Sequence, residues 1–135
     1  MGESVEGGCL CGDVRYRIQG HPLSSGTCLC RTCRKASAAP VVPWLHVSTG
    51  SFSFTSGKPV EFHSSPNVTR TFCGRCGTPL TYVLASYVNA LDVTTCSLDD
   101  PERFPPMAHS WMSHKLGWLQ LADDLPYFEE GPPLG

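Results

Sequence analysis

The chain has 135 residues, of which 41% are aliphatic, aromatic or cysteine and 16% are charged, a balance typical of one globular domain. The formal net charge is −2 and Lys and Arg form no run, which argues against binding to a nucleic-acid backbone. No apolar run approaches the ~20 residues that cross a membrane, and the first residues do not resemble a signal peptide. We therefore expect a single cytoplasmic domain over residues 1–135, ordered from about 5 to 130.

The first half of the chain predicts two strands, a short helix and a third strand. Polar and apolar residues alternate over 13–18, which indicates a half-buried strand, and a second short strand is expected to end within 26–30. Residues 31–39 are rich in helix formers and predict a short helix with Cys33 in its first turn. Residues 41–47 contain Pro43, so we expect an edge strand or a bulged one there.

The second half predicts further short strands at 51–55, 60–64, 68–72, 79–84 and 91–95. A turn or one-turn helix is expected at 98–102, followed by short apolar pieces at 109–111 and 118–121. The tail at 131–135 is rich in glycine and proline and is expected to be mobile. Short strands at this spacing predict a mostly-β domain with one short helix and a modest core.

Seven of the eight cysteines fall into three tight groups, which are Cys9 and Cys11, then Cys28, Cys30 and Cys33, and then Cys73 and Cys76. In an extended segment residues two apart point to the same face, so the paired thiols of the first two groups can reach one metal ion. Glycines around the third group permit the tight turn of a zinc knuckle. Thiols this dense are typical of zinc ligands. A disulfide scaffold is the alternative, and the absence of a signal peptide argues against it.

The number of thiols predicts two zinc ions of different kinds. A closed structural zinc has four protein ligands, whereas a catalytic zinc has three and keeps one position open. We therefore expect a structural zinc on the two flanking pairs, Cys9, Cys11, Cys73 and Cys76, and a catalytic zinc on Cys28, Cys30 and Cys33. The alternative is a second structural zinc, closed by Cys96 or by a histidine.

Cys96 and the histidines need separate interpretations. Cys96 follows an apolar strand without a neighbouring thiol, so we expect a free, buried cysteine. Three histidines at loops or strand edges are expected on the surface, namely His21, His46 and His63. His109 and His114 flank Trp111, and either is a candidate proton carrier in a pocket.

Five segments carry a resemblance to a known family, namely GGCLCGDVRY at 7–16, CLCRTCRK at 28–35, TFCGRCGTPL at 71–80, LDDP at 98–101 and DLP at 124–126. In this order they resemble the glutathione-dependent formaldehyde-activating enzyme family, to which centromere protein V also belongs. The resemblance covers about residues 5–130. The sequence departs from the common pattern at Leu29, Ala38 and Ala39, which leaves the substrate open.

The resemblance implies a β-tent fold of small antiparallel sheets around zinc sites, with the same division of cysteines that the count of thiols gave. It implies a carbon–sulfur lyase type of activity that forms or breaks thiol adducts, such as S-(hydroxymethyl)glutathione from glutathione and formaldehyde. The implied partners are a small thiol and an aldehyde, not a nucleic acid or a membrane. Arg31, Arg34 and Lys35 are candidates for attracting the glutathione carboxylates. The alternative function is a non-catalytic zinc module that binds another macromolecule.

The expected chemistry follows from the charge of the ligands. Zinc with three thiolates carries one net negative charge, which makes it a poor Lewis acid but a good holder of a nucleophilic sulfur. We therefore expect the cysteines of the central group to present a thiolate, while another donor polarises the carbonyl group. The sequence does not identify that donor.

Overall fold

The computed structural model describes residues 3–132, which form strands, one α-helix and short 3-10 turns. The elements are β1 (Ser4–Gly8), β2 (Arg15–Gln19), β3 (Ser24–Cys28), α1 (Arg31–Ser37), β4 (Val42–Ser48), η1 (Thr49–Ser51), β5 (Phe52–Ser56), β6 (Val60–Ser65), β7 (Val68–Phe72), β8 (Pro79–Leu84), β9 (Ala90–Thr94), η2 (Thr95–Ser97), η3 (Pro101–Arg103), β10 (His109–Ser110) and η4 (Met112–His114). The prediction of a mostly-β fold with one short helix is confirmed.

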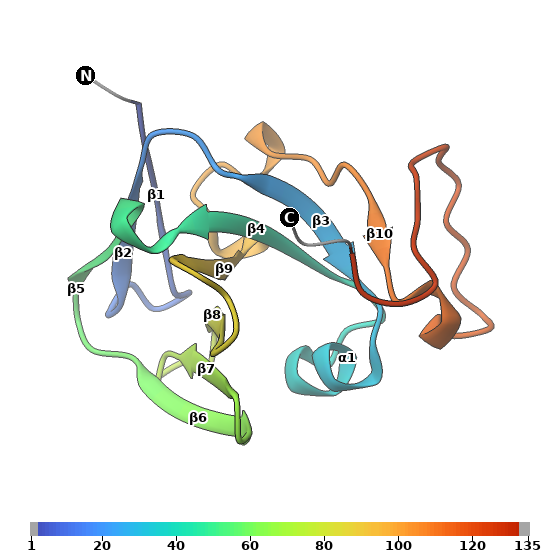
Figure 1. Ribbon diagram of the computed structural model, residues 1–135. Helices are drawn as coiled ribbons and strands as arrows, with labels where there is room; N and C mark the ends of the chain where they lie inside the picture. Colours follow the sequence, from blue (N-terminus) through green and yellow to red (C-terminus); the bar gives the residue numbers. More distant parts are fainter. Residues whose placement is uncertain (1–2, 133–135) are drawn as a thin grey trace.

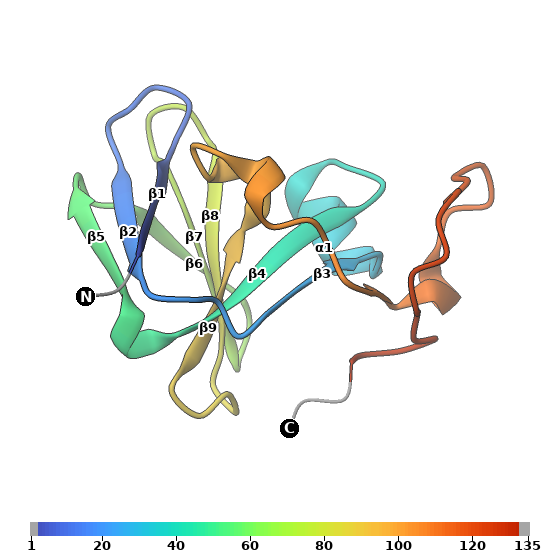
Figure 2. The same ribbon diagram turned by 90° about the horizontal axis from the view of Figure 1, so that it is seen from above.

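The strands form two sheets that lie against each other. The first has the order β1-β2-β5, and the second has the order β10-β3-β4-β9-β8-β7-β6. Neighbouring strands are antiparallel except for β10, which runs parallel to β3. Both views show the three-stranded sheet at one side of the molecule and the C-terminal segment, coloured orange to red, beyond β3 at the other (Figure 1 and Figure 2).

The hydrophobic core lies between the two sheets. Tyr16 and Ile18 of β2 are fully buried against Leu45, Val47 and Val93 of the larger sheet. Alternation along each strand turns these side chains to one face, and burying each contributes ~1.5–3 kcal/mol. The opposite face of the larger sheet is therefore free to carry polar and aromatic side chains.

The prediction that residues 41–47 form an edge or bulged strand is wrong, because β4 lies between β3 and β9 without a register shift. Pro43 is accommodated because β9 pairs with β4 only from Trp44 to Ser48. At Pro43 itself the strand has a partner on one side only, Thr27 of β3, so the missing N–H interrupts no ladder with β9.

The ends of the chain need two remarks. β1 begins at Ser4, where no strand was predicted from the sequence. The predicted mobile tail at 131–135 falls mostly outside the described residues, which end at 132. Over residues 3–132, no helix has the length and apolar character needed to cross a membrane.

Candidate metal centres and active site

The outer cluster is the set of four cysteines Cys9, Cys11, Cys73 and Cys76. The first two lie in the connection between β1 and β2, and the last two lie in the connection between β7 and β8. The backbone N–H of Val14 donates to Cys9 Sγ at 3.2 Å, and that of Arg75 donates to Cys73 Sγ at 3.3 Å. The outer cluster thus joins a turn of the three-stranded sheet to a turn of the seven-stranded sheet.

The spacing of the four sulfur atoms fits a tetrahedral metal ion. They all lie within 4.8 Å of one another, and Cys11 Sγ is 3.6 Å from Cys9 Sγ and 3.7 Å from Cys73 Sγ. A tetrahedral zinc with Zn–S bonds of about 2.3 Å places its sulfur atoms about 3.8 Å apart. The hydroxyl of Thr78, 3.3 Å from Cys76 Sγ, is the main cause that lowers the pKa of Cys76 to about 5. A thiolate is the form that binds metal, so this donor set fits zinc.

The central cluster is the set of three cysteines Cys28, Cys30 and Cys33. Cys28 is the last residue of β3, and Cys30 is the N-cap of α1, where its Sγ accepts a hydrogen bond from the N–H of Cys33 at 3.3 Å. Cys33 is buried in the first turn of α1, as the sequence predicted. The turn from strand to helix brings the three sulfur atoms within 4.8 Å of one another, which also fits a metal ion.

The three central thiols are not equivalent. Hydrogen bonds with Cys28 and Cys33 lower the pKa of Cys30, whereas hydrogen bonds with Cys30 and Cys33, together with burial, raise the pKa of Cys28. The surroundings therefore favour the thiolate at Cys30 and the neutral thiol at Cys28. Among the described residues, no histidine or carboxylate joins this group as a fourth ligand.

Cys96 belongs to neither cluster. It lies in η2 and is exposed, so the prediction of a buried thiol is wrong. The side chain faces solvent because β9 ends at Thr94 and the chain turns there, while Thr95 takes the buried position. The proposal that Cys96 closes the central cluster has no support in this geometry.

Arg70 of β7 lies beside the central cluster and is buried, with 9% of its surface exposed. Its Nη2 donates to Cys33 Sγ at 3.8 Å, its Nε donates to Ser64 Oγ at 3.1 Å, and the guanidinium lies 4.9 Å from the centre of the Tyr82 ring. No carboxylate in the described part of the chain forms an ion pair with it. Because a buried charge needs a partner, the sulfur of Cys33 and the face of the Tyr82 ring are the groups placed to offset the charge of this guanidinium.

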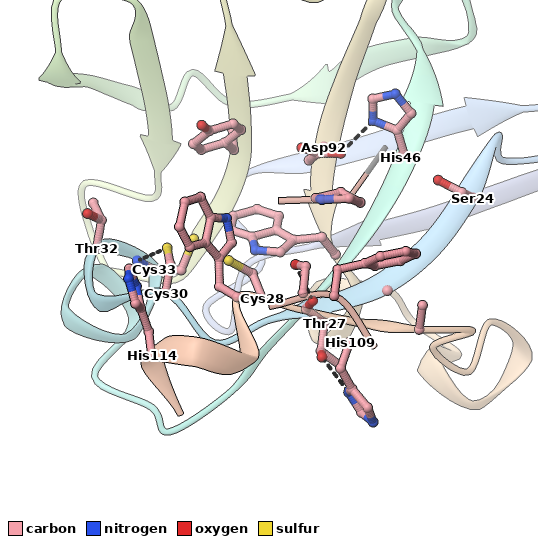
Figure 3. A pocket seen from close by; sticks show the side chains of 18 of the residues that line it. Ser24, Thr27, Cys28, Cys30, Thr32, Cys33, His46, Asp92, His109 and His114 are labelled. Carbon is pink, nitrogen blue, oxygen red and sulfur yellow. Dashed lines mark hydrogen bonds and ion pairs between the residues drawn. The ribbon is translucent and has the colours of Figure 1, made fainter. Parts of the chain in front are cut away.

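A cavity of about 770 Å³ opens next to the central cluster. Its floor is the face of the larger sheet that points away from the core. Strand register places His46, Asp92 and Tyr82 on this face, one beside another across β4, β9 and β8, and Trp44 lies on the same face two residues before His46 in β4. Figure 3 shows the three cysteines gathered in one part of this cavity, with His46 and Asp92 in another.

His46 forms a half-buried polar group with Asp92 and Tyr87 in the wall of the cavity. Its Nδ1 lies 2.7 Å from Asp92 Oδ1, and the hydroxyl of Tyr87 donates to Asp92 Oδ2 at 3.2 Å. The hydrogen bond to Asp92 raises the pKa of His46, although burial acts against it. The prediction of a surface position for His46 is therefore wrong, since the pairing of β4 with β9 turns the ring onto Asp92.

The other histidines divide into two groups. His21 and His63 are exposed, as predicted. His109 is buried and has both ring nitrogens occupied, by Thr27 Oγ1 at 2.6 Å and by the carboxylate of Asp123 at 3.0 Å, so it serves to anchor the C-terminal segment. Both His109 and His114 line the cavity, and the ring of His114 lies 4.8 Å from that of Trp111 with its Nε2 3.4 Å from Arg31 Nη1.

The C-terminal wall, residues 107–132, borders the cavity at the edge of the larger sheet, where β10 pairs with β3. Hydrogen bonds hold its two arms together, including Trp111 N–H to Glu130 O at 2.9 Å and Phe128 N–H to His109 O at 2.8 Å. Trp111 has a left-handed backbone with φ of 60°, which is costly for a bulky side chain. These bonds hold the indole of Trp111 and the ring of Phe128 in the lining of the cavity.

Comparisons with known proteins agree with this arrangement. The sequence model of the glutathione-dependent formaldehyde-activating enzyme family matches residues 4–114. A protein of Halomonas elongata whose name assigns it to the same family is 25% identical over 127 residues, which cover 87% of this chain and 80% of the relative. A crystal structure of a Rhodobacter sphaeroides protein has the same fold, with a TM-score of 0.59 at 15% identity, covering 90% of this chain and 98% of that one.

The chain belongs to the glutathione-dependent formaldehyde-activating enzyme family, because the family match spans most of its length, including every cysteine of both clusters. The resemblance predicted from five short segments is thereby confirmed. The sequence alone did not reveal Arg70 or the group around His46. The available signal for Arg70 was a charged residue in the middle of the strand predicted at 68–72.

Proposed function

We propose that this chain is a zinc-dependent enzyme that forms or breaks a carbon–sulfur bond in thiol adducts of carbonyl compounds. The formation of S-(hydroxymethyl)glutathione from glutathione and formaldehyde is one such reaction. The observation that carries this proposal is the position of the central cluster, whose three sulfur atoms line a cavity large enough for a small substrate. A three-thiol group that adjoins a cavity is suited to chemistry, whereas four thiols suit a closed structural site.

The proposal assigns two zinc ions to the chain. Cys9, Cys11, Cys73 and Cys76 would hold a structural ion, and Cys28, Cys30 and Cys33 would hold a catalytic one. A bound zinc would supply electrostatic stabilisation of a thiolate at neutral pH. The match of donor type and sulfur spacing in both clusters supports this assignment. The single domain over residues 1–135 is part of the same proposal.

The chain's own groups would perform the remaining steps. The thiol proton must reach the carbonyl oxygen when the adduct forms, and it must return when the adduct breaks. His114 is the cavity-lining histidine next to Trp111, and His46 is held by Asp92, so these two side chains are suited to moving the proton. Arg70 would offset the negative charge that collects on the cysteine sulfurs and on an incoming thiolate.

The test is metal analysis together with a survey of thiols and aldehydes. Protein purified without added metal should contain close to two zinc ions per chain, and adduct formation should be followed by NMR in the presence of glutathione and formaldehyde. Cys30→Ser is the control, since it should lose one zinc and the activity together. Purified protein without metal and with its cysteines in disulfides would rule the proposal out. Two tightly held zinc ions without activity toward any thiol–aldehyde pair would favour the non-catalytic binding module.

A further inference from the structure

We infer that the cavity beside the central cluster takes the adduct of a thiol with an aldehyde that carries a flat apolar group, such as an aromatic ring. This inference rests on the proposed function for the type of reaction, and it goes further by naming the class of aldehyde. It is carried by the chemistry of the two cavity walls and by the way in which the charged groups of the cavity are already paired.

The sheet supplies an aromatic wall. The rings of Trp44 and Tyr82 lie 5.7 Å apart, and Tyr87 continues the row at 6.4 Å from Tyr82. The strand partner of Trp44 is Gly26, which also lines the cavity and has no side chain to cover the indole. Cys28 lies two residues further along the same strand, so the aromatic row begins directly beside the central cluster.

The C-terminal wall supplies a second apolar surface of the same cavity. Trp111, Phe128 and Met107 line the cavity from this side. The left-handed backbone of Trp111 is an observation independent of the sheet, because such strain persists only where the surrounding structure enforces it and is concentrated at ligand sites. Two aromatic surfaces that face one cavity favour a flat apolar group between them, since stacked rings attract each other beyond the burial of their area.

The charged groups in the cavity are engaged with the protein. Asp92 is paired with His46, and the guanidinium of Arg70 is bonded to Cys33 and Ser64. The other arginine in the lining is Arg31, which is exposed. The charged parts of a thiol such as glutathione would therefore stay near Arg31 and water, because burying an unpaired carboxylate is costly. The apolar interior is left for the group that the aldehyde contributes, and formaldehyde contributes a single carbon.

The reaction is written with glutathione as the thiol and benzaldehyde as the aldehyde. The sulfur attacks the carbonyl carbon, one S–C bond forms and the π bond of the carbonyl opens. The thiol proton ends on the carbonyl oxygen, which becomes the hydroxyl of the hemithioacetal. The reverse reaction returns both reactants, so no oxidant or reductant is needed.

Binding of two unreactive thioethers tests the inference without turnover. S-benzylglutathione should bind the purified protein about tenfold or more tightly than S-methylglutathione, as measured by calorimetry. Trp44→Leu and Phe128→Ala, one change in each wall, should each remove most of this preference. Trp118→Leu is the matched control, because Trp118 is 70% exposed and does not line the cavity. Equal affinity for the two thioethers, or an unchanged preference in folded wall variants, would overturn the inference.

Turnover separates this inference from the proposed function. Rates with glutathione and either benzaldehyde or formaldehyde are each divided by the uncatalysed rate, because formaldehyde is the more reactive aldehyde. A larger acceleration with benzaldehyde is expected. A larger acceleration with formaldehyde would overturn the inference and leave the proposed function standing. Absence of acceleration with any aldehyde, in protein that holds two zinc ions, would overturn the proposed function itself.

Discussion

The two cysteine clusters use the same ligand atoms in different surroundings. The outer cluster lies where turns of both sheets meet, and its sulfur atoms accept hydrogen bonds from backbone N–H groups. The central cluster lies at one helix end beside a cavity, and a buried arginine contacts one of its sulfur atoms. Backbone donors suit a site that must hold its shape, whereas a nearby side-chain charge suits one whose own charge changes during a reaction.

The sharpest test of this difference compares Cys73→Ser with Cys30→Ser. Cys73→Ser should unfold or aggregate the protein, because apparent zinc binding in small structural sites contributes ~10–16 kcal/mol, which is comparable with the whole stability of a domain. Cys30→Ser should keep the β fold and lose one zinc. Circular dichroism and metal content distinguish the two outcomes. Equal loss of structure in both variants would mean that the central cluster is also structural.

The second test removes the buried guanidinium that contacts the central cluster. Arg70→Met should lower catalytic efficiency or the zinc affinity of the central cluster about 10- to 100-fold, because it leaves the sulfur charge uncompensated. Arg70→Lys should recover part of the loss, since it restores the charge without the planar fork. The measurement is zinc competition with a coloured chelator, alongside turnover.

Arg75→Met is the matched control for Arg70→Met. Arg75 lies between Cys73 and Cys76 in the chain and its backbone N–H donates to Cys73 Sγ, but its side chain is 71% exposed and pairs with Asp13 at the surface. It should leave both zinc affinities within about twofold of the original, as exposed ion pairs contribute little. A larger loss in Arg75→Met than in Arg70→Met would reverse the distinction between the clusters.

The third test measures how the stability contributed by the His46–Asp92 pair in the cavity wall depends on pH. Asp92 raises the pKa of His46 above its ordinary value of 6.5. The ion pair should therefore stabilise the fold fully below about pH 6.5 and lose this contribution as the pH rises through the folded pKa. His46→Gln should destabilise the protein more at pH 5.5 than at pH 8.5, by denaturant unfolding. His21→Gln, in an exposed position, should show no such difference. Parallel losses in both variants would contradict the expectation.

The smallest effect is expected at Cys96. Because its side chain is exposed and outside both clusters, Cys96→Ala should keep two zinc ions and change the unfolding free energy by less than about 0.5 kcal/mol. Elemental analysis and thermal unfolding of this variant provide the measurement. Loss of one zinc would make Cys96 a ligand and would leave the central cluster without an open position.

The sequence predicted the local elements well because their signals are local. The short strands predicted at 68–72 and 79–84 are β7 and β8 at their observed bounds, and the helix formers after Cys30 identified α1. β1 was missed because Gly7 and Gly8 resemble a turn. Within the strand, Gly7 is needed because a side chain there would collide with Tyr16 and with the backbone of Ser97.

The sequence predicted the parts of the candidate site whose residues are close together in the chain. It did not predict contacts between residues that are distant in the chain and meet only because their strands are neighbours in the sheet. Cysteines two or three residues apart indicate their own grouping. His46 and Asp92 meet only because β4 and β9 are neighbours, although 46 residues separate them in the chain. The contact between Arg70 and Cys33 is harder to predict, because it joins β7 to the first turn of α1, and these two elements do not pair in a sheet. The hydrophobic pattern of the sequence predicts individual strands, but it does not predict which side chains of different elements come into contact.

The part of the cavity wall beyond residue 114 bears on how the cavity can differ between members of this family. Both cysteine clusters and the sheet lie within residues 4–114, which the family shares, whereas Phe128 lies beyond them. Substitutions or altered length in this late segment would reshape one side of the cavity while leaving every cysteine of both clusters in place. Relatives could thus acquire new substrates by exchanging the end of the chain, with the two cysteine clusters inherited unchanged.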